Sequence, residues 1–251
     1  MPEFRETVSS ISPFVHECGS FRSLHFSLGE VQSRMNLLEP CALDLEYSRT
    51  MMGFLLFKPE PRHIAMVGLG GWSLAKFCHR HLPATHIEVV EINPHVLALR
   101  DEFQIPPDDE RFTVLLGDGA AFVRHADSGC DVLMVDGFDD DGQPFSLSSQ
   151  AFYDDCADHL QRDGILVVNL VSRHPQHALF VDRIRRSFAD EVLVVETSSL
   201  GNSIVFAFKD PHVRLHRSGV LPAPTLLDRE AGRQLSASFA DILTALRNKQ
   251  R

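Results

Sequence analysis

Short apolar runs alternate with stretches of helical pattern from residue 62 to about residue 190. The apolar runs are nearly continuous in hydrophobic residues, as expected of strands that are buried on both faces of a parallel sheet. We predict five such strands, at residues 63–67, 86–91, 112–116, 131–136 and 165–170. Helices are predicted between them, and this alternation is typical of an α/β domain with a mostly parallel sheet.

The pattern changes at the end of this region. Residues 191–196 and 203–208 are both strand-like, but the six residues between them leave no room for a crossover helix. We therefore expect a terminal antiparallel strand pair in a doubly wound, Rossmann-like sheet of seven strands.

Two flanking regions complete the predicted organisation. Residues 14–35 alternate weakly around a glycine and predict a short β-hairpin, and residues 43–57 predict a helix that ends at a pair of prolines. Residues 211–224 contain three prolines and predict a loop, followed by an amphipathic helix at residues 226–246. We divide the chain into an N-terminal hairpin and helix (residues 1–60), the α/β domain (residues 61–210) and a C-terminal loop and helix (residues 211–251).

Composition and charge narrow the range of partners. With 251 residues, 44% of them hydrophobic, the chain can form one globular domain with a small appendage. Its formal net charge of −10 does not favour nucleic acid or an anionic membrane, but it suits cationic small molecules. No apolar run approaches the roughly 18 residues that a membrane helix needs. The first ten residues contain acids and no apolar stretch, so we do not expect them to act as a signal peptide.

Cysteine and histidine usage bears on location and metals. The five cysteines are scattered without a CxxC pair, and the 13 histidines show no HExxH or His-x-His spacing. We therefore expect reduced cysteines, a cytoplasmic protein and no metal site.

Candidate chemistry follows the carboxyl ends of the predicted strands, where ligands bind in open α/β sheets. The turn at residues 68–71, Gly-Leu-Gly-Gly, either lets a nucleotide approach the backbone or serves only packing. Trp72, next to it, either covers the ligand or packs on the adjacent helix. Glu91 ends the second strand, where a carboxylate can accept both hydroxyls of an adenosine ribose; the alternative is a solvated acid.

Acidic residues follow the next two strands. Asp118 lies in a Gly-Asp-Gly turn, where it either caps the following helix or accepts from an adenine amino group. Asp136 follows a buried run and precedes three consecutive aspartates, Asp139, Asp140 and Asp141. Such carboxylates can bind a cationic amine and take its proton before attack, although at least one of Asp140 and Asp141 is expected to be only a solvated loop residue.

The order and spacing of these motifs resemble the spermidine synthase (polyamine aminopropyltransferase) family, whose core is the class I methyltransferase fold. The resemblance extends from about Phe21 to Phe208. It is strongest in SLGEVQSRM, EYSRTMMGFLLFKPEPRHIAMVGLGG, VEINPHVLALRDEF, RFTVLLGDGAAFV and DVLMVDGFDDDGQPFSLSSQAFYDDC.

The resemblance implies a nucleoside half of the site. Gly68 and Gly70 would hold the nucleoside sulfonium of decarboxylated S-adenosylmethionine or S-adenosylmethionine. Glu91 would bind its ribose, and Asp118 with Gly119 its adenine.

It also implies an amine half. Gln32 and Tyr47 match positions that line the active site, on the cofactor side and the substrate side respectively. Asp136 matches the proton-accepting carboxylate, and Asp139 a second carboxylate that binds the amine. The implied reaction is attack of a neutral amine on the aminopropyl group of decarboxylated S-adenosylmethionine, in a homodimer and without a metal.

The sequence departs from the family in the amine half. Gly71 replaces the aspartate of the family's GGGDGG turn, Asp140 replaces a proline, and the Tyr-Pro pair of a late loop is absent from TSSLGNS. The N-terminal β-region is also short. Three functions therefore remain open: an aminopropyltransferase with altered amine specificity, a methyltransferase that uses ordinary S-adenosylmethionine, and a non-catalytic nucleoside-binding relative.

Overall fold

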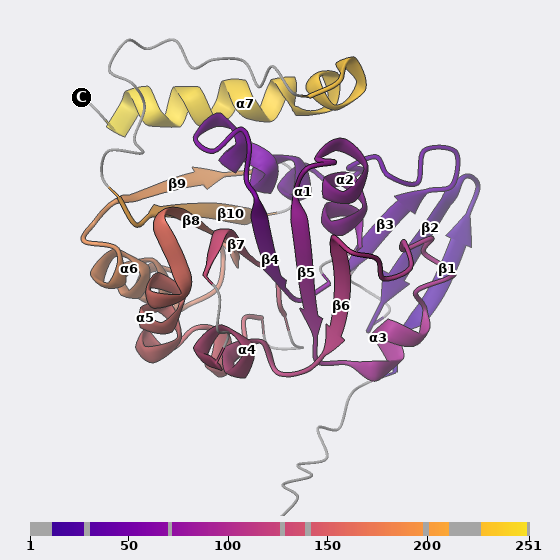
Figure 1. Cartoon of the computed structure of the whole chain (residues 1–251), viewed down its shortest axis with the longest axis horizontal. Helices are drawn as coiled ribbons and strands as arrows, with labels where there is room; N and C mark the ends of the chain where they lie inside the picture. Colours follow the sequence, from indigo (N-terminus) through magenta and orange to yellow (C-terminus); the bar gives the residue numbers. More distant parts are fainter. Residues whose placement is uncertain are drawn as a thin grey trace, which may run out of the picture.

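Two sheets organise the chain. The computed structural model describes residues 12–27, 31–69, 72–125, 129–138, 142–197, 201–210 and 227–249. Within these ranges a seven-stranded sheet with helices on both faces lies beside a three-stranded sheet (Figure 1).

The large sheet has the strand order β6-β5-β4-β7-β8-β10-β9. Its strands are β4 (His63–Val67), β5 (His86–Glu91), β6 (Phe112–Leu116), β7 (Cys130–Val135), β8 (Leu160–Val171), β9 (Val192–Glu196) and β10 (Asn202–Phe208). Strands β4 to β8 pair in parallel with one another, whereas β10 runs antiparallel to both β8 and β9. The predicted doubly wound sheet with a terminal antiparallel pair is therefore confirmed.

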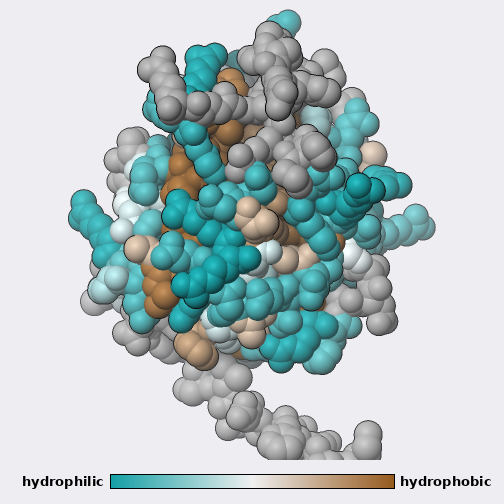
Figure 2. All heavy atoms as spheres, turned by 90° about the vertical axis from the view of Figure 1, so that its left-hand side faces the viewer, coloured by the Kyte–Doolittle hydropathy of each residue, from teal (hydrophilic) through white to brown (hydrophobic). Residues whose placement is uncertain are grey.

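Helices bury both faces of this sheet. Along β4, Ile64 and Met66 belong to one hydrophobic cluster, while Ala65 and Val67 belong to the other. The first cluster is covered by α1 (Glu46–Met51), the 3-10 helix η1 (Met52–Leu56), α2 (Ser73–His81) and α7 (Arg229–Lys249); the second is covered by α4 (Gly119–His125), α5 (Gln150–His159) and α6 (His177–Ser187). Two short helices, α3 (Pro94–Ala98) and η2 (Phe145–Leu147), follow β5 and precede α5. The outward surface at the end formed by α5 and α6 is mostly hydrophilic (Figure 2).

Local signals explain where several helices begin. The Asn93 side chain accepts from the His95 amide before α3, and the Ser149 hydroxyl accepts from the Phe152 amide before α5.

The helix predicted at residues 43–57 is observed as α1 continued by η1, and α7 packs against both. This packing is close at Gly53, where a Cβ would lie 2.2 Å from Ile242 Cδ1. None of the helices in the described ranges is both long and apolar enough to cross a bilayer.

The N-terminal sheet is larger than the hairpin that the sequence predicted. Strands β1 (Phe14–Cys18) and β2 (Phe21–His25) form that hairpin around Gly19, and β3 (Ser33–Asn36) pairs with the other edge of β2. A four-residue strand has too short an alternation to stand out in the sequence. Tertiary packing supports it instead, because Met35 is 1% exposed.

A buried lysine joins this small sheet to the large domain. Lys76, on α2, is 1% exposed, and its Nζ donates to Met35 Sδ and to the Phe103 carbonyl oxygen, both at 2.8 Å. Burial lowers the pKa of Lys76 to about 8. The three-stranded sheet is therefore held against the side of the domain that carries α2.

Candidate functional site

Three backbone hydrogen bonds tie the carboxyl ends of four parallel strands into one edge. The Gly68 amide donates to the Val90 carbonyl, the Asp136 amide to Val67, and the Gly117 amide to Glu91, each at 2.9 Å. The residues that follow β4, β5, β6 and β7 are thus neighbours, as the sequence predicted for an open α/β sheet. We call this the carboxyl edge; in Figure 1 it is the end to which the arrows of β5 and β6 point.

Gly68 brings two parts of this edge into direct contact. Its φ is +83°, and a Cβ at this position would lie 2.6 Å from the carbonyl oxygen of Asp136. Only glycine fits both the backbone conformation and the close approach. Gly68 therefore has a packing role that places the start of the glycine turn beside Asp136. Gly70 and Gly71 lie outside the described residues.

Trp72 belongs to the core. Its side chain is fully buried and stacks on Phe103, with ring centroids 5.9 Å apart and an interplanar angle of 5°. Its backbone has a φ of 64°, and its amide donates to the Leu69 carbonyl oxygen. Of the two interpretations of Trp72, the packing one agrees with the structure.

Glu91 is buried, with 9% exposure, and is not the solvated acid of the alternative interpretation. Its Oε2 accepts from the Leu69 amide at 2.9 Å, and its Oε1 accepts from the Asn93 amide at 2.8 Å. Burial raises the pKa of Glu91, and these backbone donors oppose the rise. Each oxygen has further lone-pair capacity, so the carboxylate can fix the glycine turn and still accept from a ligand hydroxyl.

Asp118 caps α4. Its Oδ1 accepts from the Ala121 amide at 2.7 Å, which is the helix-capping role that the sequence allowed. The exposed carboxylate has capacity for a second partner, so the capping contact is compatible with the adenine role. Gly119 packs directly on β4, because a Cβ there would lie 2.2 Å from Val67 Cγ1.

Large aliphatic side chains near these acids face solvent. Ile92, directly after Glu91, is 44% exposed, and Leu116, at the end of β6, is 60% exposed. Neighbouring strand ends place both at the carboxyl edge. Apolar surface beside a carboxylate and a helix N-terminus suits a flat heterocycle with a polar edge.

Asp136 is the buried acid of the site, with 6% exposure. Its Oδ1 accepts from Asn169 Nδ2 at 2.8 Å, and Asn169 Oδ1 accepts from Asn202 Nδ2 at 3.0 Å. Its Oδ2 is buried and has no well-aligned donor within the described ranges. Burial raises the pKa of Asp136 to about 6, against the lowering effect of Asn169 and Tyr47. The result is an oriented carboxylate that is ionised at neutral pH.

Tyr47, on α1, lies beside this carboxylate. Its side chain is buried, and burial together with the charge of Asp136 raises the pKa of the Tyr47 hydroxyl well above its usual value. The hydroxyl therefore stays protonated and acts as a donor. The structure thus brings together Tyr47 and Asp136, which the sequence placed in the same half of the site.

Sequence reasoning missed three side-chain amides: Asn169 and Gln143, which are buried, and Asn202, which is partly buried. Asn169 and Asn202 form the chain of hydrogen bonds described above, and Gln143 has both side-chain polar atoms buried without a partner in the part of the chain that the structure describes. Gln143 precedes η2, whose Leu147 would contact a Cβ placed on Gly137. A polar residue inside the apolar run of β8 was the one signal that could have identified Asn169.

Two predicted residues are not connected to Asp136 by the structure. Gln32 lies just before β3, and its amide donates to the Leu24 carbonyl oxygen at 3.0 Å, while no contact of its side chain with Glu91 or Asp136 is observed among the described residues. Asp139, like Asp140 and Asp141, lies outside those residues. Their roles stay predictions.

Known proteins are similar to this chain in sequence and in fold. A family model described as "Spermine/spermidine synthase domain" matches residues 45–195. The polyamine aminopropyltransferase of Neisseria meningitidis serogroup A is 40% identical over 197 residues, which cover 78% of this chain and 75% of that protein.

Two solved structures are similar as well. A probable spermidine synthase from Corynebacterium glutamicum has a TM-score of 0.69 at 18% identity, covers 85% of this chain and 81% of its own, and shows a shared fold. Human methyltransferase-like protein 13 in complex with SAH has a TM-score of 0.58 at 25% identity, over 78% of this chain and 93% of its own. The resemblance found in the sequence is confirmed: this chain is a transferase that belongs to the spermine/spermidine synthase family.

Proposed function

We propose that the protein transfers the aminopropyl group of decarboxylated S-adenosylmethionine to a small amine and releases methylthioadenosine. The observation that most supports this is the buried carboxylate of Asp136, which Asn169 orients and whose Oδ2 has no well-aligned donor within the described ranges. A transfer to nitrogen needs such a group, because an amine that arrives as an ammonium ion must lose a proton before it can attack.

The proposed reaction begins with a proton transfer to Asp136. Its Oδ2 takes the proton of the ammonium group, and the nitrogen lone pair attacks the carbon next to the sulfonium. The new N–C bond forms as the C–S bond breaks, and the electron pair of that bond converts the sulfonium to a neutral thioether. Tyr47 and Asn169 hold the carboxylate in place, and they lower its pKa so that it is ionised at neutral pH.

The nucleoside half is assigned to the ends of β4, β5 and β6. Glu91 would accept from the ribose hydroxyls while it holds the glycine turn through the Leu69 amide. Ile92 and Leu116 would lie against the adenine, and Asp118 would accept from its amino group. Glu91 ends β5, which only β4 separates from β7 and Asp136, and β6 lies beyond β5 at the same edge of the sheet.

The acceptor half supports an altered amine specificity. Gly71 provides no carboxylate where the family has an aspartate, so a polyamine would have fewer charged partners. Asp139 is proposed as the remaining second carboxylate. We assign to this half an acceptor that is less charged or bulkier than putrescine.

A methyltransferase reaction is the second candidate, because human methyltransferase-like protein 13 is similar to this chain and was solved with SAH. Calorimetric titration of the full chain with decarboxylated and ordinary S-adenosylmethionine separates the two. We expect tighter binding of the decarboxylated form. A preference for the ordinary form would favour methyl transfer, and binding of methylthioadenosine without any turnover would favour the non-catalytic alternative.

Location and assembly are also proposed. All five cysteines are free, as is typical of a reducing compartment, and we place the protein in the cytoplasm. We propose a homodimer, which light scattering of the purified chain would test.

Replacing Glu91 with glutamine should weaken methylthioadenosine binding roughly tenfold to a hundredfold, because a neutral amide loses charge-assisted bonds to the ribose hydroxyls. Calorimetry with methylthioadenosine measures the change. The exposed Glu110→Gln provides a control with the same change in charge and should bind like the parent. Equal affinity in the Glu91 and Glu110 variants would remove Glu91 from the ribose site.

Replacing Asp136 with asparagine should lower turnover by about 100-fold or more, because the amide keeps the shape but cannot accept the proton. Methylthioadenosine affinity should change little. Near-normal turnover would show that another group takes the proton.

The same variant should be more stable than the parent above pH 6. The pKa of Asp136 is about 6 in the folded chain and about 3.9 in an unfolded chain, so protonation stabilises the fold fully below pH 3.9 and this contribution is lost as the pH rises through 6. Removing the buried charge should therefore raise the free energy of unfolding by about 1–3 kcal/mol at pH 7.5, and the gain should vanish near pH 4. Urea unfolding at both pH values, followed by the fluorescence of Trp72, checks this and separates lost catalysis from lost folding.

Asn169→Leu should shift the acidic limb of the pH profile of kcat/KM to higher pH, because the lost donor raises the pKa of Asp136. Ser203→Ala removes a different, partly buried hydrogen bond, from β10 to His177 on α6, and should leave the limb in place. An unchanged limb in the Asn169 variant would assign to Asn169 a purely structural role.

Putrescine should be a poor acceptor with a high KM, because each charged hydrogen bond that is absent costs about 1–3 kcal/mol. Gly71→Asp should improve kcat/KM for putrescine, while Gly232→Asp, on α7 and away from the site, should not. Efficient use of putrescine by the parent chain would show that other acids supply the missing contacts.

A further inference from the structure

Two histidines and a glutamate meet at the opposite end of the sheet from the site, where β4 and β5 begin. His63 is paired with His86 across the two strands, and Ala65 with Glu88, so the three side chains lie on one face of the sheet. His63 Nε2 and a Glu88 oxygen are 2.7 Å apart, and the rings of His63 and His86 are 5.1 Å apart in an edge-to-face arrangement. One ligand atom from each residue can be chosen so that all three atoms lie within 4.8 Å of one another.

We propose that His63, His86 and Glu88 bind a zinc ion that links the amino ends of β4 and β5, with water in the fourth position. Two imidazoles and a carboxylate are a ligand set that zinc accepts, at about 2.0–2.2 Å from the metal. Ligand atoms at such distances in a tetrahedral site are about 3.3 Å apart, so small side-chain rotations bring the observed atoms into place. The metal would replace the hydrogen bond between His63 Nε2 and Glu88.

The surroundings of the cluster suit a cation. His63 and Glu88 are partly exposed, with side-chain exposures of 17% and 27%, so an ion can enter from solvent. The positive charge of Lys58 is paired with Asp131 and Asp163. Asp131 also accepts from the His63 amide.

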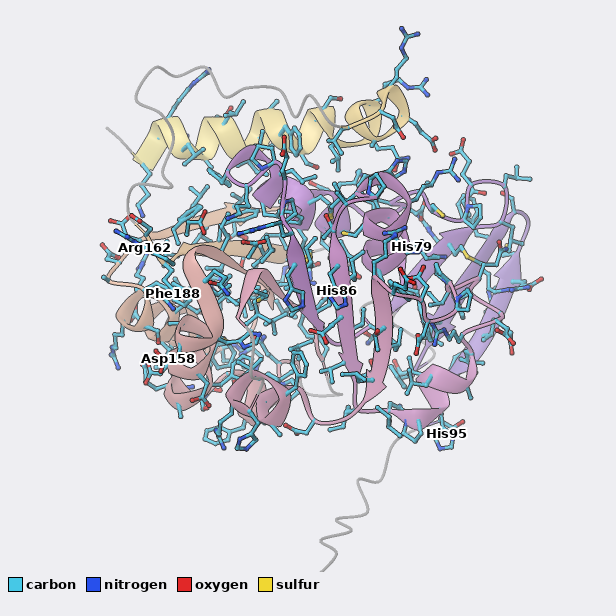
Figure 3. All side chains as sticks on the ribbon, in the orientation of Figure 1. His79, His86, His95, Asp158, Arg162 and Phe188 are labelled. Carbon is cyan, nitrogen blue, oxygen red and sulfur yellow. The ribbon has the colours of Figure 1, made fainter. Side chains whose placement is uncertain are left out.

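Strand pairing creates this cluster. His63 and His86 are 23 positions apart, outside the short spacings that indicate metal ligands in a sequence, and for this reason the sequence predicted no metal site. Figure 3 labels His86 on β5, and also His79 on α2. His79 contacts one carboxylate, Asp109, at 3.3 Å and is not part of a three-ligand cluster among the described residues, so it provides a matched control.

Zinc titration of the metal-free full chain, in competition with a chromophoric chelator, tests the assignment. We expect one site per chain with micromolar or tighter affinity and a zinc-dependent rise in Tm. His86→Asn and Glu88→Gln should each weaken binding on the order of 100-fold, whereas His79→Asn should bind like the parent. Circular dichroism would show that the variants fold.

Cobalt(II) distinguishes this site from the free cysteines. At a nitrogen and oxygen site its spectrum should show ligand-field bands without the thiolate charge-transfer band that cysteine ligation produces. A thiolate band, zinc binding that persists in both ligand variants, or no binding in the micromolar range would overturn the assignment and leave His63 and Glu88 as an ordinary hydrogen-bonded pair. None of these measurements depends on the transferase activity.

Discussion

The close approach of the ends of β4 and β7 is the constraint on which the site depends. Gly68 has no side chain and a positive φ, and so the backbone after β4 can pass against the carbonyl of Asp136. A larger residue would separate the glycine turn from the acid. The two halves of the site are adjacent because the residue at this position has no side chain.

The buried carboxylate of Asp136 is the second constraint on the structure. A charge in the interior disfavours folding unless hydrogen bonds compensate for the lost water, and Asp136 is compensated only in part. Asn169 and Tyr47 support it from β8 and α1, while Oδ2 lacks a well-aligned donor within the described ranges. Incomplete compensation raises the pKa of this acid to about 6, which suits a proton acceptor at neutral pH.

The antiparallel strand β10 contributes to the site although it lies beyond the parallel part of the sheet. Asn202, at its start, donates to Asn169 on β8, and Asn169 donates to Asp136. The terminal strand pair, which departs from simple β/α alternation, thus supports the position of the acid. The two faces of the sheet contribute different residues. Helix α1 brings Tyr47 to one face, and α4, on the other face, begins at the capping residue Asp118.

The sequence by itself determined the α/β sheet, its terminal antiparallel pair and the positions of Glu91, Asp118 and Asp136 at strand ends, because buried strands produce apolar runs and the residue after each run lies at the carboxyl edge. It also carried the family resemblance, through the order of its motifs.

Only the tertiary structure decided which polar residues meet. Asn169 is 33 positions from Asp136, yet the pairing of Val135 with Val168 places the two side by side. His63 meets His86 for the same reason. Strand register is set by packing between distant segments, and hydrophobic periodicity within one segment does not contain it.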